Sequence, residues 1–118
     1  MIERRTLDHT SLSEIERDAL TDLRTRLSDG LDFVDEIILF GSAARGTATP
    51  ESDIDLLVLT IYPLSYQQRH QITHVLSDIN DLYETNFSSF VIDRREWEEG
   101  LIAVLPIKHE IERDGVAV

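Results

Sequence analysis

Two short and nearly continuous apolar runs constrain the fold of this chain most strongly. The first lies within Val34–Phe40 and the second within residues 53–60. Because strands that are buried on both faces have such runs, each is predicted to be an inner strand of a sheet. Residues 41–52, which separate the two runs, contain two Gly and one Pro and are expected to form a polar loop. The sequence therefore predicts a sheet in which a polar loop joins two buried strands.

The segment before the first strand has the pattern of an amphipathic helix. Ser11 and Glu14 fit a capping box, and Gly30 offers a C-terminal stop. Between them the apolar residues recur at helical spacing: Leu12, Ile15, Ala19, Leu23 and Leu27. Residues 1–10 are expected to be a flexible lead-in. Residues 11–118 are expected to be a single domain, since one core typically serves ~100–200 residues.

Three further elements are expected after the second strand. A helix should include residues 72–83, a strand 87–92, and a last helix about 94–113, broken or kinked at Pro106. A strand, helix, strand crossover of this length normally joins parallel neighbours. The predicted fold class is therefore α/β (α+β), a small mixed sheet flanked by helices in the order α-β-β-α-β-α.

Two carboxylates stand at the start of the second strand. Asp53 and Asp55 flank Ile54, and because side chains alternate along a strand, both should project from one face. Two like charges so close are costly unless a cation neutralises them. Mg²⁺ prefers hard oxygen ligands and is usually held by one or two carboxylates together with substrate phosphates. The alternative is that both side chains lie on a solvated strand end and bind nothing, since short motifs often match by accident.

The preceding loop favours a site for phosphate beside that cation. Gly41 permits close approach of a ligand to the backbone, and Ser42 offers a hydroxyl and an N–H group. Arg45 supplies a permanent charge whose fork geometry suits phosphate, and Gly46 lets the chain turn again. Taken alone, however, the two glycines fit equally well as turn residues and Arg45 as a surface charge.

The combination resembles the signature of the DNA polymerase β nucleotidyltransferase superfamily. It consists of Gly41 and Ser42, ten further residues that include Arg45, Gly46 and Ser52, and then Asp53 and Asp55. Within the superfamily the chain resembles the minimal nucleotidyltransferase (MNT) family of single small domains. The leading helix, the apolar strand before Gly-Ser and the tail at residues 111–115 also agree with that family.

The resemblance implies both a reaction and the residues that serve it. An acceptor hydroxyl would attack the α-phosphorus of a nucleoside triphosphate, and pyrophosphate would leave. Asp53 and Asp55 would be catalytic and would bind magnesium. The implied nucleotide-binding residues are Gly41, Ser42, Arg45, Gly46 and Ser52, of which the first two would contact the β and γ phosphates.

Active members of the superfamily carry a third carboxylate on the next strand, and this chain has none there. The strand predicted at residues 87–92 contains no acid. Asp93 ends that strand and should lie roughly 15–20 Å from the required level, at ~3.3 Å per residue. Glu84, just before the strand, is the only nearby acid with plausible reach, and capping the preceding helix is its alternative role.

Three functional interpretations follow. The first is transfer of a nucleotide, AMP from ATP being the expected case, to a hydroxyl of a partner protein. The resemblance implies an antitoxin that modifies a toxin of the HEPN class. The second is a catalytically degenerate module that binds nucleotide or a partner without transfer, because the third carboxylate is missing. The third is a protein-interaction module without nucleotide chemistry.

Composition limits the partners and the compartment. The chain has 11 basic and 23 acidic residues, a net charge of −12 and no Cys. Such a surface repels phosphate backbones, so stable binding of nucleic acid is not expected. No apolar run approaches the ~20 residues of a membrane helix, and the N-terminus lacks a targeting pattern. A cytoplasmic protein without membrane contact is therefore expected, and its oligomeric state stays open.

A few other side chains invite interpretation. His70 and His74 share a helix face at the spacing of a zinc pair, but a surface role is favoured because no metalloprotease acid lies between them. Trp97 is expected to pack against the sheet. Arg94 and Arg95 stand at a predicted helix start, where positive charge is mildly unfavourable, and a partner contact is one explanation for them.

Overall fold

A mixed four-stranded sheet organises the protein, whose computed structural model describes residues 10–118. Its strands are β1 (Val34–Phe40), β2 (Ile54–Thr60), β3 (Phe87–Asp93) and β4 (Val116–Ala117), in the spatial order β3-β2-β1-β4. β2 and β3 are parallel, whereas β1 is antiparallel to both β2 and β4. The predicted parallel crossover is therefore confirmed. β4 was not predicted, because it is only two residues long.

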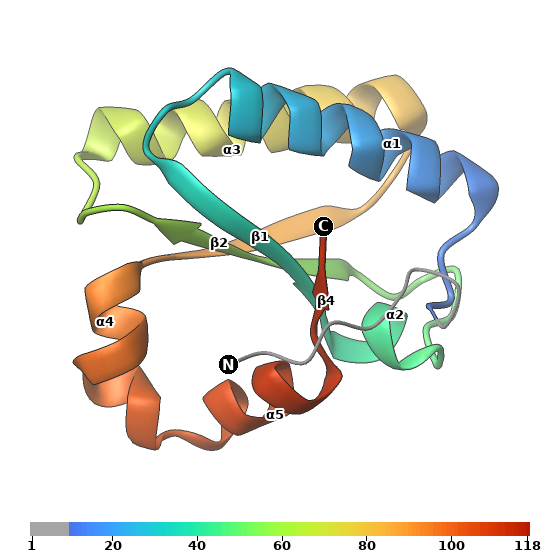
Figure 1. Ribbon diagram of the computed structural model, residues 1–118. Helices are drawn as coiled ribbons and strands as arrows, with labels where there is room; N and C mark the ends of the chain where they lie inside the picture. The colour runs from blue at the N-terminus through green and yellow to red at the C-terminus, as the bar shows by residue number, and fades with distance from the viewer. Residues whose placement is uncertain (1–9) are drawn as a thin grey trace.

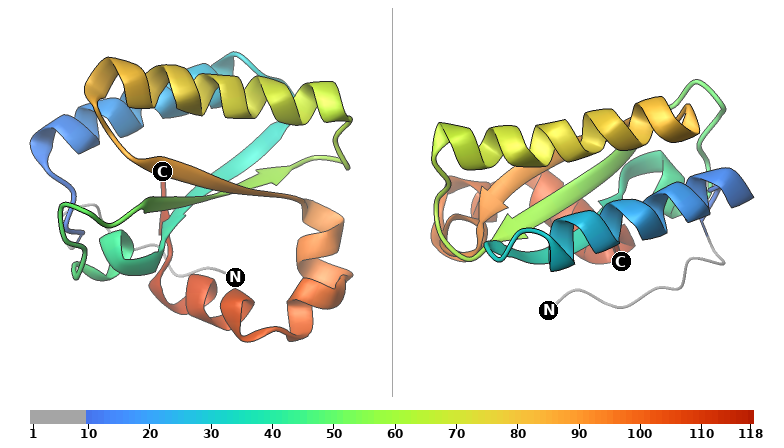
Figure 2. Two further views of the ribbon diagram at one scale, coloured as in Figure 1. Left: turned by 180° about the vertical axis from the view of Figure 1, so that it is seen from behind. Right: turned by 90° about the horizontal axis from the view of Figure 1, so that it is seen from above.

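Helices cover both faces of this sheet. In chain order they are α1 (Glu14–Arg24), the π-helical turn η2 (Thr25–Asp29), α2 (Gly41–Arg45), α3 (Tyr66–Tyr83), α4 (Arg94–Glu99), the 3-10 turn η3 (Leu101–Val104) and α5 (Pro106–Asp114). α1 and α3 lie side by side on one face, and α4 and α5 lie on the other (Figures 1 and 2). The predicted α/β class with helices flanking a mixed sheet is confirmed.

Each face of the sheet has its own hydrophobic cluster because side chains alternate along the strands. Leu39, Leu56 and Val58 point toward α1 and α3 and belong to the larger cluster. Leu57 belongs to the smaller cluster, which packs against α4 and α5. Trp97 of α4 is only 3% exposed and lies in that smaller cluster, so its predicted packing against the sheet is confirmed.

The first helix begins two residues later than predicted. Ser13, not Ser11, is the N-cap residue, and it forms a reciprocal capping box with Glu16. The sequence offers the same Ser-x-x-Glu spacing twice, and tertiary contacts choose between them. The Ser11 N–H donates to the Ala43 carbonyl at 3.0 Å, which holds the residues before α1 against α2.

Two other helical predictions were incomplete. The loop expected at residues 41–52 begins with the short helix α2, which Gly46 ends in a left-handed conformation. The last helical segment breaks at Pro106, as predicted, since Leu105 is extended, but it also breaks earlier, at Gly100, which was not predicted. Pro106 is the first residue of α5, a position where its missing N–H is not needed and its fixed φ suits the helix.

The segment expected to be a lead-in lies, apart from Thr10, outside the described residues. Within residues 10–118, no helix combines the length and the apolar composition that crossing a membrane requires.

Candidate nucleotide-binding and metal-binding site

The site begins where β1 turns sharply into α2, beside the start of β2. The antiparallel register makes Phe40, the last residue of β1, the partner of Asp55. Gly41 follows with a φ of 76°, a conformation that L side chains rarely adopt. A Cβ atom on Gly41 would lie 2.6 Å from Asp55 Oδ2. The turn therefore needs glycine for its conformation and for its close contact with the carboxylate.

The two predicted carboxylates lie on the same side of the sheet, next to polar residues at the start of β3. Asp53 immediately precedes β2, and Asn86 Nδ2 donates to its Oδ1 atom at 2.8 Å. Asp55 is the second residue of β2, and Ser88 Oγ donates to its Oδ1 atom at 2.9 Å. Ser88 is also the register partner of Asp55. Asp53 and Asp55 are two residues apart, and so are their donors Asn86 and Ser88. The two hydrogen-bonded pairs therefore lie side by side on one face of the sheet.

Burial distinguishes the two acids and places them at the rim of the sheet. Asp55 is half-buried, whereas Asp53 is exposed. Leu57, two residues after Asp55 and on the same face of β2, belongs to the hydrophobic cluster that packs against α4 and α5. The carboxylates therefore lie on the α4 and α5 face, at the end where β2 begins and β1 ends. A ligand can approach them from solvent.

The loop between α2 and β2 is held by short polar contacts. Thr47 donates both its backbone N–H and its hydroxyl to the Ser42 carbonyl, at 3.0 and 3.4 Å. The Ser11 hydroxyl accepts from the Ala48 N–H at 3.1 Å. Ser11 was predicted only as a helix cap, so its role in supporting this loop was missed. A contact across 37 residues of sequence leaves no local signal.

Four of the five predicted phosphate-binding residues lie in or next to α2, and Gly41 is the one that meets a carboxylate. Gly41 and Ser42 open α2, a five-residue helix that no side chain caps. Arg45 ends the same helix and is exposed. Gly46 follows with a φ of 78°.

Ser52 is directed to a different part of the loop. Its Oγ atom accepts from the Thr49 N–H at 3.0 Å and lies 3.2 Å from Thr49 Oγ1. Ser52 also lines a pocket of about 380 Å³ together with Ile54, whose side chain belongs to the cluster on the α1 and α3 face. The structure therefore associates Ser52 with the side of the loop opposite to Asp55.

Neither candidate for a third carboxylate joins Asp53 and Asp55. Asp93 pairs with Thr60 at the far end of β2, and its carboxylate accepts from the Glu96 N–H as the N-cap of α4. Glu84 is exposed and ends α3 in a left-handed conformation, with a φ of 54°. Among residues 10–118, no three His, Asp or Glu side chains gather closely enough to hold a metal ion.

The two carboxylates nevertheless suit a cation that phosphates also bind. Their oxygens are hard ligands, they project from one side, and the Oδ2 atom of Asp55 faces the Gly41 turn. Neutral donors from Asn86 and Ser88 occupy the opposite side. The donor set therefore fits one magnesium ion shared with a bound triphosphate.

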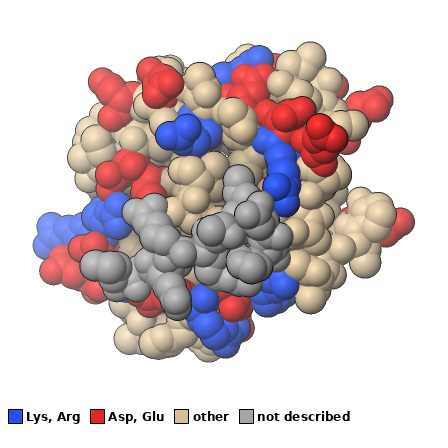
Figure 3. All heavy atoms as spheres, turned by 45° about the vertical axis from the view of Figure 1, so that its right-hand side comes forward, with Lys and Arg blue, Asp and Glu red and all other residues tan. Residues whose placement is uncertain are grey.

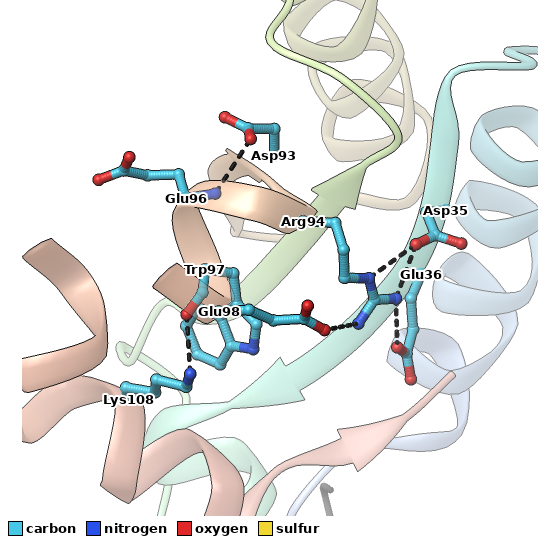
Figure 4. Close-up of polar contacts among 8 residues, drawn as sticks. All are labelled: Asp35, Glu36, Asp93, Arg94, Glu96, Trp97, Glu98 and Lys108. Carbon is cyan, nitrogen blue, oxygen red and sulfur yellow. Dashed lines mark hydrogen bonds and ion pairs between the residues drawn. The ribbon is translucent and has the colours of Figure 1, made fainter. Parts of the chain in front are cut away.

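The sequence did not explain why Arg94 stands at a helix start. In the structure Arg94 forms ion pairs with acidic residues of the same chain. Its guanidinium lies 2.7 Å from Asp35 and 3.1 Å from Glu36, both in β1, and 4.0 Å from Glu98 (Figure 4). Partial burial alone would lower the pKa of Arg94, but the hydrogen bonds to Asp35 and Glu36 outweigh it and raise that pKa. Arg95 is 88% exposed and pairs only weakly, with Glu99 at 3.4 Å.

The two histidines of α3 have separate partners on its surface. The His70 ring stacks on Tyr66, with ring centroids 6.3 Å apart. His74 Nε2 lies 3.4 Å from the Asp78 carboxylate. Both histidines are exposed, as expected for surface residues.

A Gly-Ser turn at the end of one strand meets a carboxylate of the next strand, which is the arrangement expected from the Gly-Ser and Asp-x-Asp motifs. The nucleotidyltransferase domain family matches residues 17–108, and the chain belongs to this family. A candidate protein adenylyltransferase of Methanocaldococcus jannaschii is 33% identical over 78 residues, which cover 66% of this chain and 76% of that protein. The family expected from the Gly-Ser and Asp-x-Asp spacing is therefore confirmed.

Two solved structures share the fold at low sequence identity. A candidate nucleotidyltransferase from Sulfolobus solfataricus has a TM-score of 0.59 at 18% identity, covering 99% of this chain and 89% of that one. A chain of the toxin–antitoxin complex MntA–HpeT has a TM-score of 0.54, also at 18% identity, covering 85% of this chain and 69% of that one. These likenesses show a shared fold.

Proposed function

We propose that this protein transfers AMP from ATP to a hydroxyl group of a partner protein. The observation that carries the proposal is the contact of the Gly41 turn with the Asp55 carboxylate, beside Asp53. This arrangement brings a phosphate-binding turn and a cation-binding pair together at one end of the sheet. The M. jannaschii relative, which is named as a candidate protein adenylyltransferase, supports AMP as the transferred group and protein as the acceptor.

In this proposal each part of the site has a distinct task. The N–H groups and hydroxyl at Gly41 and Ser42 bind the β and γ phosphates, and the exposed Arg45 adds positive charge. Asp53 and Asp55 hold magnesium, which when bound neutralises charge on the phosphate oxygens. The acceptor oxygen attacks the α-phosphorus, the bond to the bridging oxygen breaks, and pyrophosphate leaves. Glu84 or a residue of the partner accepts the hydroxyl proton.

Surface chemistry supports a protein as the acceptor. On the face displayed in Figure 3, basic side chains are interspersed among acidic ones and form no continuous stripe for a phosphate backbone. On η3, Leu101 and Val104 are 80% and 77% exposed, and contiguous exposed apolar side chains often mark protein interfaces. The likeness to a chain of a toxin–antitoxin complex supports a toxin as the partner. From the resemblance to the MNT family, we propose that this toxin is of the HEPN class.

The first test is label transfer. The chain, ATP labelled at the α-phosphate, magnesium and the protein encoded by a neighbouring gene are incubated together, and labelled protein is detected after electrophoresis. We expect one or more AMP groups on the partner, and none with the Asp53→Asn/Asp55→Asn variant. Asp18→Asn/Asp78→Asn, on exposed surfaces of α1 and α3, makes the same change in charge and should leave transfer intact. Label that survives the first double substitution would remove this site from the mechanism.

A second function, nucleotide binding without transfer, is favoured by one specific observation. The residues beside the two carboxylates are neutral: Asn86, which immediately precedes β3, and Ser88 of β3. For a binding module, ATP with magnesium raises the melting temperature, because any ligand that binds only the folded state stabilises it. No label then reaches the partner. If ATP does not change the melting temperature, both functions fail and a protein-interaction role is left.

The role of Glu84 is tested separately. If Glu84 accepts the hydroxyl proton, Glu84→Gln should reduce transfer about 10²-fold or more, in the range of general-base contributions, while ATP still raises the melting temperature. Unchanged transfer would assign proton acceptance to the partner.

A further inference from the structure

The two oxygens of the Asp55 carboxylate face different surroundings. Oδ2 lies toward the Gly41 turn, whereas Oδ1 accepts a hydrogen bond from Ser88. Asp53 is arranged in parallel, since its Oδ1 atom accepts from Asn86. The Asp55 carboxylate therefore has one oxygen directed to the Gly41 turn, while the neutral donors Asn86 and Ser88, at the start of β3, each occupy one oxygen of the pair.

We propose that Ser88 limits this site to a single divalent cation when the triphosphate is bound. The inference rests on the proposed function, because it assumes that nucleotide and cation bind at Asp53 and Asp55. A cation on the side of Gly41 can share carboxylate and phosphate oxygens. A second cation on the side of β3 would find a hydroxyl and an amide group instead of a third carboxylate.

Charge explains why one residue can set the number of cations. A divalent cation is held by anionic oxygens, and each of the two carboxylates already serves the first cation. Ser88 is the register partner of Asp55 and touches its carboxylate, so an acid at position 88 would add the missing charge at the right level. Three carboxylates so close repel one another until a second cation neutralises them.

The same strand supplies a matched control. Ser89 is exposed like Ser88 and is its immediate neighbour. Its register partner is Leu56, whose side chain belongs to the cluster on the α1 and α3 face. Because side chains alternate along a strand, Ser89 lies on the face opposite to Asp55. Ser88→Asp and Ser89→Asp thus add the same charge to β3 on opposite faces.

The test counts bound Mn²⁺, used as a spin-active substitute for magnesium. The full chain is saturated with an ATP analogue whose α and β phosphates are joined by a methylene group, and free Mn²⁺ is measured by electron paramagnetic resonance. The analogue alone is titrated in parallel. We expect one Mn²⁺ per complex for the unaltered chain and for Ser89→Asp, and two for Ser88→Asp.

The outcomes separate this inference from the proposed function. Two Mn²⁺ ions in the unaltered complex would overturn the inference alone, as would a single ion in a folded Ser88→Asp variant. If the analogue does not bind the unaltered chain at all, both the inference and the proposed function are overturned. Circular dichroism verifies folding. Should Ser88→Asp not fold, the count for the unaltered chain decides, and Asn86→Asp, beside Asp53, serves as the second variant.

Discussion

At the scale of single residues, Gly41 joins the local conformation to the chemistry of the site. Two properties require glycine there, the left-handed φ of 76° and the missing side chain that lets Asp55 approach. The sequence identified Gly41 as a point of close approach because it follows a buried strand directly. It did not identify the neighbour, because the pairing of Phe40 with Asp55 is a matter of strand register. Gly46 has the same sign of φ at the other end of α2.

Gly41→Ala should therefore weaken the binding of ATP with magnesium more than Gly46→Ala does. Both variants place a Cβ atom at positive φ, which costs about 1–2 kcal/mol. Only the Gly41 variant is expected to press on Asp55, since its Cβ would lie 2.6 Å from Oδ2. We expect Gly41→Ala to abolish the rise in melting temperature that ATP with magnesium produces, and Gly46→Ala to retain part of it. Equal responses to ATP in the two variants would contradict the role of this contact.

At the scale of elements, α4 shows how a tertiary contact reverses a local preference. Its first residues, Arg94 and Arg95, carry positive charge where a helix favours negative charge. The Asp93 cap offsets part of this cost. Arg94 gains more by reaching across to Asp35 and Glu36, which ties the start of α4 to β1 (Figure 4). No pattern within either segment predicts this contact, because 59 residues separate Arg94 from Asp35.

Arg94→Met should destabilise the protein, whereas Arg95→Met should not. Methionine keeps most of the apolar stem and removes the charge, so the difference isolates the ion pairs. We expect Arg94→Met to lower the free energy of unfolding by about 1 kcal/mol, since its pairs are partly shielded from solvent. Arg95, 88% exposed, should contribute less than about 0.5 kcal/mol. Urea denaturation measures both, and equal effects would contradict the structural role of these ion pairs.

At the scale of the whole molecule, one hydrogen bond joins the two helices on the same face of the sheet. Tyr83 of α3 donates to Asp22 Oδ2 of α1 at 2.9 Å. This bond lowers the pKa of Asp22 below its usual value of 3.8, with Arg26 adding to the effect. It also raises the pKa of Tyr83 above 10.0. The bond therefore stabilises the fold across the range in which Asp22 is ionised and Tyr83 is protonated.

Tyr83→Phe should reduce stability in a pH-dependent way. Because the pKa of Asp22 is lower in the folded state, the bond's contribution is present above pH 3.8 and is lost as the pH falls through the lowered pKa. Urea denaturation from about pH 7 down to about pH 3 should show the deficit of the variant shrinking. Tyr66→Phe is the control, since that ring is 83% exposed. A deficit for Tyr83→Phe that stays constant across this range would contradict the assignment.

The sequence by itself determined the class of the fold, the family and the chemistry expected at the site. Apolar runs and helical spacing are local properties of the sequence. They indicate a strand or a helix whichever element the apolar face later packs against. The Gly-Ser and Asp-x-Asp motifs are local as well, so the two halves of the site could be named. The parallel pairing of β2 and β3 followed from the length of the crossover.

Only the tertiary structure decided which side chains meet. Strand register set Gly41 against Asp55 and placed Asn86 and Ser88 beside the acids, because a shift of one residue would turn each side chain to the other face. The tertiary structure also decided between equivalent local signals. Of the two Ser-x-x-Glu patterns before α1, only the one that begins at Ser13 forms the cap. The sequence predicted that the third strand lacks an acid where it enters the site. The structure identified the hydrogen-bond donors that occupy that place.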